Sequence, residues 1–346
     1  METPPQVSLR DPAVAETART AERATATRRS RRRAVAWLAW AALGVGFSAG
    51  ERDAQAFCRS RTVSIDPSFN PGDAKGCFEE GVPLFWRNAC VGYSIDNRVS
   101  RKLAFDVVAN VVARSFTRWT GASCATEGAA SSRTSIDVRD VGPALCQKVE
   151  TALDRPNVNV ILFRDNDWKI ADGAARSPEI IGLTTVKFNV ETGEIFGADM
   201  ELNTFHHTMS GAEPSANEYD LTSVVTHEAG HFLGMAHSEQ VQAVMYATYD
   251  KGRSSARELF GDDVRGICAV YRPDGTRPVL GGKVTSGGAC NPTPYAGLQR
   301  DCESEASTGG CSAVGAVLRE EGSGPALAST IAVVGLLVVV KKRRRR

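Results

Sequence analysis

One feature that often marks a metal or redox protein is missing from this chain of 346 residues. None of its nine cysteines forms a Cys-x-x-Cys pair, which argues against zinc-ribbon and dithiol redox motifs. The sequence has no internal repeat, and only 7% of its residues are aromatic. With 42% hydrophobic and 23% charged residues, it is typical of a globular protein and is not collagen-like, coiled-coil or wholly disordered.

An excess of basic residues is also missing from the body of the chain. The formal net charge is +1, but the bases are concentrated at the two ends. Residues 57–340 hold 26 basic and 34 acidic side chains, a net charge of −8. Proteins that bind nucleic acid present basic surfaces, so this acidic body argues against a nucleic-acid partner.

Residues 1–56 are predicted to be an N-terminal extension with a signal peptide. Five arginines within 28–33 precede an uncharged run over 34–50, which is the order of charge and apolarity in a secretory signal. Cleavage sites of the small-residue type occur at 54–56 and at 48–50. An uncleaved N-terminal anchor is the alternative.

Residues 311–346 are predicted to carry a C-terminal membrane helix. The uncharged run 322–340 is long enough, at about 1.5 Å per residue, to cross a hydrocarbon core of about 30 Å. The six bases at 341–346 would hold that end on the cytoplasmic side. With Cys311 upstream, the segment resembles the sorting tags of myxobacterial surface proteins, which implies processing and lipid attachment near Cys311. A plain membrane anchor is the alternative.

The cysteine count agrees with export. Without Cys311, eight cysteines remain, an even number that suits four disulfides in an oxidising compartment. One pair, Cys290 with Cys302, is expected because the two are near neighbours in a stretch without an apolar pattern. The expected location is the cell surface, the outer envelope or the medium.

One folded domain is predicted over 83–272. A Cys-containing segment, 57–82, precedes it, and a linker rich in Gly, Pro, Ser and Thr, 273–310, follows it. The domain contains segments with helical and strand patterns in the order helix, mixed strands, helices, which indicates an α+β fold. The expected helices lie near 103–119, 220–233 and 262–271, and the expected strands at 158–163, 183–189 and 194–202.

The most informative segment is His-Glu-Ala-Gly-His followed by Gly234 and His237. On a helix His227 and His231 lie on one face, so they can bind one metal ion. Gly234 can end the helix in a left-handed conformation and bring His237 round as the third ligand. Three histidines leave a fourth position open for water, which is the pattern of a catalytic zinc site.

Glu228 follows the first histidine directly, so its carboxylate lies beside the metal without being a ligand. It can take a proton from a water at the open position and later deliver one to a leaving amine. Zinc brings the pKa of such a water from ~15.7 towards ~7 and polarises a carbonyl. The predicted reaction is hydrolysis of peptide bonds by direct attack of water, with Glu228 as general base.

The histidine segment is similar to the extended zinc signature of metzincin peptidases. Residues 243–249 resemble their Met-turn, with Met245 under the zinc. Ser238, the Met-Tyr-x-x-Tyr spacing and the helix starting at Asp262 resemble the matrixins, the branch that includes matrix metalloproteases. The resemblance covers about 83–272.

The resemblance implies a metzincin-like fold with a twisted mixed sheet, an active-site helix and a cleft. It implies that the strand 182–186 lies beside an extended substrate and that Tyr246 and Tyr249 line the pocket beyond the scissile bond. Two family features are absent. His206 and His207 are too few for a second, structural zinc, and no Pro-Arg-Cys-Gly latency motif occurs.

Calcium is a weaker expectation. Short acidic clusters offer the oxygen ligands that Ca²⁺ prefers, although such clusters are usually solvated turns. The candidate ligands are Asp165, Asn166, Asp167, Asp199, Glu201 and Asn203.

The predicted function is therefore an exported zinc endopeptidase that cuts proteins, whether prey, extracellular matrix or partners on its own surface. The alternative is an inactive or latent metzincin domain used as a surface binding or adhesion module. The presence of Glu228 and Met245 argues against that alternative, because a binding module needs neither.

Overall fold

The computed structural model describes most of the predicted domain and part of the C-terminal region. The predicted signal peptide and Cys311 lie outside the described residues. The described residues are 57–63, 71–74, 76–126, 129–145, 147–150, 155–169, 173–301 and 331–340.

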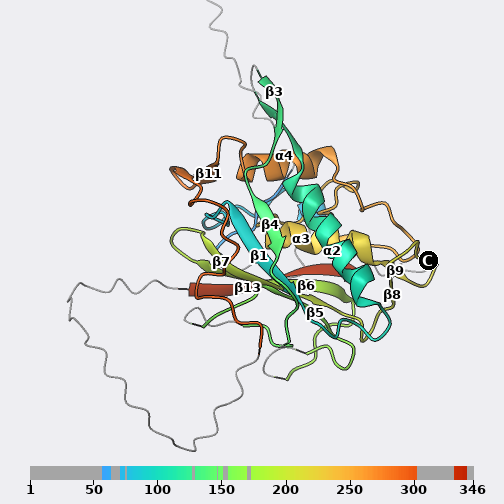
Figure 1. The fold of residues 1–346 in the computed structure, drawn as a ribbon. Coiled ribbons are helices and arrows are strands. Elements are labelled where there is room, and N and C mark those ends of the chain that lie inside the picture. Colours follow the sequence, from blue (N-terminus) through green and yellow to red (C-terminus); the bar gives the residue numbers. More distant parts are fainter. Residues whose placement is uncertain are drawn as a thin grey trace, which may run out of the picture. The chain divides into compact units, whose positions relative to one another are not determined.

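A seven-stranded mixed sheet runs through the domain in the order β10-β13-β6-β7-β5-β1-β4 (Figure 1). Neighbours pair in parallel from β4 through β1 and β5 to β7, and antiparallel at β7–β6 and β6–β13. The strands of this sheet are β1 (Cys90–Ile95), β4 (Asp137–Asp140), β5 (Val160–Phe163), β6 (Ile180–Asn189), β7 (Ile195–Leu202), β10 (Thr248–Tyr249) and β13 (Ile331–Val340).

Three two-stranded sheets lie beside the main one. Their strands are β2 (Ser123–Thr126) with β3 (Ala129–Arg133), β8 (Met209–Ser210) with β9 (Tyr219–Asp220), and β11 (Thr276–Val279) with β12 (Gly282–Thr285). The last hairpin lies in the segment that was expected to be a linker.

The helices are α1 (Pro71–Ala74), α2 (Phe105–Thr120), α3 (Leu221–Phe232) and α4 (Gly261–Val270). The apolar face of α2 is buried against α3, and the Trp119 indole N–H donates to the Thr226 carbonyl at 2.7 Å. Asp220 is the N-cap residue of α3, and its carboxylate accepts from the Ser223 N–H at 2.8 Å. These contacts fix the helix that carries the histidine motif.

The C-terminal apolar run differs from its prediction. Residues 331–340 form strand β13 and not a helix, and 322–330 lie outside the described residues. Six of the ten β13 residues are valine or isoleucine, and β-branched residues fit a pleated sheet well, so apolarity alone did not decide between the two structures. Among the described residues, no helix is both long and apolar enough to span a membrane.

Disulfides join Cys58 to Cys77, Cys90 to Cys290 and Cys124 to Cys268. The expected pairing of Cys290 with Cys302 is therefore wrong. Cys90 begins β1, and the chain after β12 packs against that strand so closely that a Cβ at Gly92 would collide with the Pro292 carbonyl.

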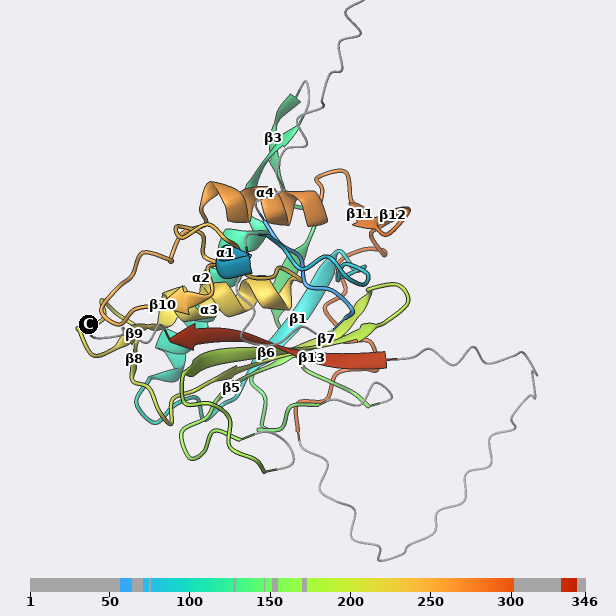
Figure 2. The same ribbon diagram turned by 180° about the vertical axis from the view of Figure 1, so that it is seen from behind.

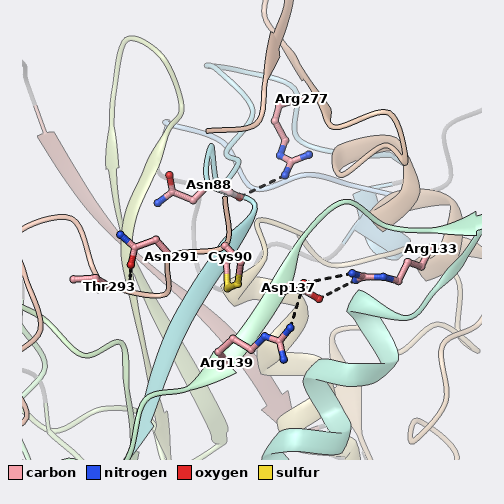
Figure 3. The surroundings of a disulfide bond; sticks show 9 residues. Asn88, Cys90, Arg133, Asp137, Arg139, Arg277, Asn291 and Thr293 are labelled. Carbon is pink, nitrogen blue, oxygen red and sulfur yellow. Dashed lines mark hydrogen bonds and ion pairs between the residues drawn. A yellow bond between two sulfur atoms is a disulfide. The ribbon is translucent and has the colours of Figure 1, made fainter. Parts of the chain in front are cut away.

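The surroundings of the Cys90–Cys290 disulfide show how the chain after α4 is attached. Arg277 of β11 is fully buried, and its guanidinium donates to the carbonyl of Asn88, two residues before Cys90 (Figure 3). Residues 277–292 are therefore fixed to the first strand by packing, hydrogen bonds and a covalent bond.

Candidate metal centre

Three histidines from α3 and the turn after it converge at one point. His227 and His231 lie one helical turn apart, and their Nε2 atoms are 3.1 Å from each other. Gly234, at φ +86°, turns the chain so that His237 joins them. The candidate ligand atoms of all three lie within 4.8 Å of one another, and all three residues are buried.

The protonation of two of these rings follows from their hydrogen bonds. His227 Nδ1 lies 2.7 Å from the Val244 carbonyl, and His231 Nδ1 lies 2.9 Å from the Met235 carbonyl. A carbonyl can only accept, so each Nδ1 carries the proton and each Nε2 presents a lone pair. Burial, together with the neighbouring histidines, lowers the pKa of both imidazoles well below the usual value.

This arrangement fits a zinc ion. Two nitrogen lone pairs at 3.1 Å repel each other unless a cation lies between them. Two ligands of a tetrahedral zinc with bonds of about 2.05 Å would be about 3.3 Å apart, which is close to the observed separation. Neutral Nε2 ligands with Nδ1 bound to carbonyls are the usual outer support of zinc histidines.

Glu228 lies fully buried beside the histidines. Its Oε2 accepts from the Thr184 hydroxyl at 2.5 Å, whereas Oε1 has no hydrogen-bond partner among the described residues. A Cβ at Gly182 would collide with the same carboxylate, so the absence of a side chain there makes room for it. Burial raises the pKa of Glu228 to about 8, and the Thr184 hydrogen bond opposes that rise.

The Met245 sulfur lies against α3 at Gly230, one residue before His231. Its place under a bound zinc stays a prediction from the Met-turn resemblance. Gly230 of α3 allows this approach, because a Cβ there would collide with the Met245 sulfur and with Trp119. The Met245 carbonyl accepts from the Ser238 N–H at 2.8 Å, which ties the turn to the residue after His237.

Asp263 was not recognised from the sequence as a residue of this centre. Its carboxylate accepts from the N–H groups of Val244, Met245 and Phe260 at 2.8 to 3.1 Å. It therefore connects α4 to the turn whose Val244 carbonyl holds His227. Burial raises the pKa of Asp263 to about 6. The only signal in the sequence is the Asp-Asp pair, which was interpreted as a helix start.

Tyr246 and Tyr249 line a cavity of about 650 Å³ next to the centre, together with Arg253, Glu258 and Phe260. The two tyrosines play different parts. Tyr249 is buried, and its hydroxyl donates to the Val244 carbonyl at 3.0 Å. Tyr246 is partly exposed.

The remaining histidines do not join the centre. His207 Nε2 lies 2.8 Å from the Pro178 carbonyl, and burial lowers the pKa of His207 to about 4. His206 stacks edge-on against Phe205. Among the described residues, no second group of three histidine, cysteine or carboxylate ligands lies close enough together to hold an ion.

Two of the expected calcium ligands, Glu201 and Asp199, have protein cations as neighbours. Glu201 forms ion pairs with Arg164 at 2.7 Å and Arg176 at 3.0 Å. Asp199 accepts from the Val160 N–H at 2.8 Å, and the charge of the buried Lys187 acts on it. These basic groups provide the positive charge that a calcium ion would otherwise supply.

The outer edge of β6 beside Glu228 is paired with β13. The two strands run antiparallel from the pair Asn189–Ile331 to the pair Gly182–Val338 (Figure 2). On its other side β13 pairs in parallel with β10. The chain's own segment therefore occupies the edge that was predicted to lie beside a substrate.

Comparison with known proteins shows which family the part of the chain around this centre is similar to. Residues 148–272 match the family model described as matrixin. This match agrees with the mixed sheet, the helices and the three-histidine group, and the chain has the α+β fold expected of a metzincin.

The individual relatives are matrix metalloproteinases of animals and plants. Human matrix metalloproteinase-20 is 39% identical over 93 residues, which are 27% of this chain and 18% of that protein. Metalloendoproteinase 1-MMP of Arabidopsis thaliana is 35% identical over 95 residues, 28% of this chain and 25% of that protein. Human matrilysin is 50% identical over 46 residues, 13% of this chain and 17% of that protein. The chain spans a quarter or less of each relative's length.

Proposed function

We propose that this protein is a zinc-dependent endopeptidase that hydrolyses peptide bonds of protein substrates. The observation that carries the proposal is the buried Glu228 carboxylate beside three converging histidines. Thr184 holds one of its oxygens, and the other has no partner within the described part of the chain. The matrixin match and the named relatives support the same class of reaction.

His227, His231 and His237 would hold the zinc through their Nε2 atoms. When bound, zinc supplies a Lewis acid that polarises the scissile carbonyl and acidifies water. Glu228 accepts the proton of the attacking water and donates it to the leaving amine. Its burial favours the second step, because burial raises the pKa of Glu228 and so stabilises the protonated form that donates to the amine.

The substrate is a protein segment in extended conformation. The edge of β6 offers backbone groups for strand addition, and the cavity beside Tyr246 offers space for one side chain. β13 now pairs with that edge, so a substrate can take this position only after β13 has left it.

We also propose that the protein is exported. The three disulfides suit an oxidising compartment, and they include the pair Cys58–Cys77 in the N-terminal segment. This pairing keeps Cys58 from acting as a thiolate on the zinc. Processing at Cys311 and the signal peptide at 1–56 stay predictions from the sequence.

An inactive binding module is the second candidate, and one experiment separates the two. The full chain is assayed on quenched casein with and without a zinc chelator, and its metal content is measured. We expect chelator-sensitive cleavage with about one zinc per chain. Glu228→Gln should bind the same zinc and lose at least about 100-fold in kcat. Zinc binding without any cleavage by the wild type would favour the binding module.

A further inference from the structure

Thr184 is the one side chain in the described structure for which a hydrogen bond to the Glu228 carboxylate is seen. It lies on β6, is fully buried, and its Oγ1 is 2.5 Å from Glu228 Oε2 and 3.2 Å from the Glu228 carbonyl. A buried hydroxyl needs a partner, and a carboxylate is the stronger of these two acceptors. The short distance shows that the bond is directed at the carboxylate.

The bond selects one orientation of Glu228. With Oε2 held by Thr184, the carboxyl plane is fixed, and Oε1 is left without a partner among the described residues. Gly182, two residues earlier on the same face of β6, provides the space that this orientation requires. A carboxylate with one fixed and one open oxygen is ready to accept a proton from one direction.

We propose that Thr184 is a positioning residue for the reaction, and that its hydroxyl holds Glu228 so that Oε1 faces the attacking water. This inference rests on the proposed peptidase function. The hydroxyl contacts neither the substrate nor the metal, so its removal should slow the chemical step and leave substrate binding and zinc affinity unchanged.

The test compares three variants of the full chain. Thr184→Val removes the hydroxyl and keeps the shape, Thr184→Ser keeps the hydroxyl, and Thr117→Val removes an exposed hydroxyl on α2, outside the proposed site. For Thr184→Val we expect kcat to fall by about 10- to 100-fold, within the range of acid–base catalysis. We expect KM and zinc content within about twofold of wild type, recovery of kcat in Thr184→Ser, and normal kcat in Thr117→Val.

Two results would overturn the role of Thr184. One is a Thr184→Val enzyme with kcat within twofold of wild type. The other is a loss of zinc or of thermal stability that accounts for the lost activity, which would make Thr184 a structural residue. Thr184→Ala is a second variant to check that branched packing does not cause the effect. If neither the wild type nor a chain that lacks β13 showed chelator-sensitive cleavage, the peptidase function itself would be disproved.

Discussion

At the scale of single residues, Gly230 decides how closely the Met-turn approaches the active-site helix. A glycine inside a helix normally costs up to about 1 kcal/mol relative to alanine, so Gly→Ala should stabilise an exposed helix. Here the new Cβ would collide with the Met245 sulfur and Trp119. We expect Gly230→Ala to lower the free energy of unfolding by about 1 to 3 kcal/mol and to weaken zinc binding.

Urea unfolding and zinc titration would measure both effects of Gly230→Ala. Gly282→Ala is the matched control, because nothing lies within 4 Å of a Cβ at that position. An unchanged or increased stability of Gly230→Ala would show that the turn has room to move away from the helix.

The buried Asp199 should make the free energy of unfolding depend on pH. Burial raises its pKa from the ordinary 3.8 to about 6, so the folded chain holds this proton more tightly than the unfolded chain does. The resulting stability is fully present below pH 3.8 and is lost as the pH rises through 6. Between pH 3.8 and 6 we expect the free energy of unfolding of the wild type to fall by up to about 3 kcal/mol relative to that of Asp199→Asn. The variant lacks the titrating carboxyl group.

The measurement for Asp199 is the free energy of unfolding at several pH values between 4 and 6.5. The exposed Asp167→Asn is the control, and it should keep the wild-type pH dependence. Parallel curves for wild type and Asp199→Asn would contradict the buried titration.

At the scale of elements, α4 supports the metal centre without touching a ligand. Asp263 near its start accepts from three backbone N–H groups, two of them in the Met-turn. In Asp263→Asn an NH2 group replaces one of the two accepting oxygens and would face the backbone N–H groups. Each buried N–H that loses its acceptor costs about 1 to 3 kcal/mol of stability. We expect a loss of about 2 to 4 kcal/mol in unfolding free energy and weaker zinc binding, because His227 is held by the same turn.

A chelator competition and thermal unfolding would test the role of Asp263. Asp106→Asn, in the exposed first turn of α2, changes the same kind of group without this contact. If Asp263→Asn retained wild-type zinc affinity, the connection from α4 to the histidines would be wrong.

The elements also show which parts of the structure are local enough to predict. The histidine helix and the hairpin β6–β7 follow from short patterns, and they lie within three residues of their expected bounds. The role of Asp263 as an acceptor for the Met-turn N–H groups depends on how α4 packs against a turn that precedes it in the chain. The pairing of Cys90 with Cys290 joins residues 200 apart in sequence. A short sequence pattern carries no information about contacts between residues so far apart in the chain.

At the scale of the whole molecule, the C-terminal strand meets the active-site strand. Nine residues of β13 pair with β6, and the pair Gly182–Val338 lies where β6 passes Glu228. Apolarity and length predicted a membrane helix for this segment, but the pattern contains no information about a sheet edge that is open to another strand. An extended substrate would need the same backbone groups on β6.

Removal of β13 should therefore increase the proposed peptidase activity. We expect a chain ending at Thr330 to cleave quenched casein with kcat/KM raised about tenfold or more, because a tethered segment competes at an effective concentration of about millimolar. A chain ending at Val340 retains β13, loses only the six terminal bases, and should behave as wild type. A synthetic peptide of residues 331–340 should inhibit the shortened enzyme in competition with casein. Equal activity of the two shortened chains would show that β13 does not block the edge of β6 in solution, and cleavage of the peptide would make the segment a substrate instead of an inhibitor.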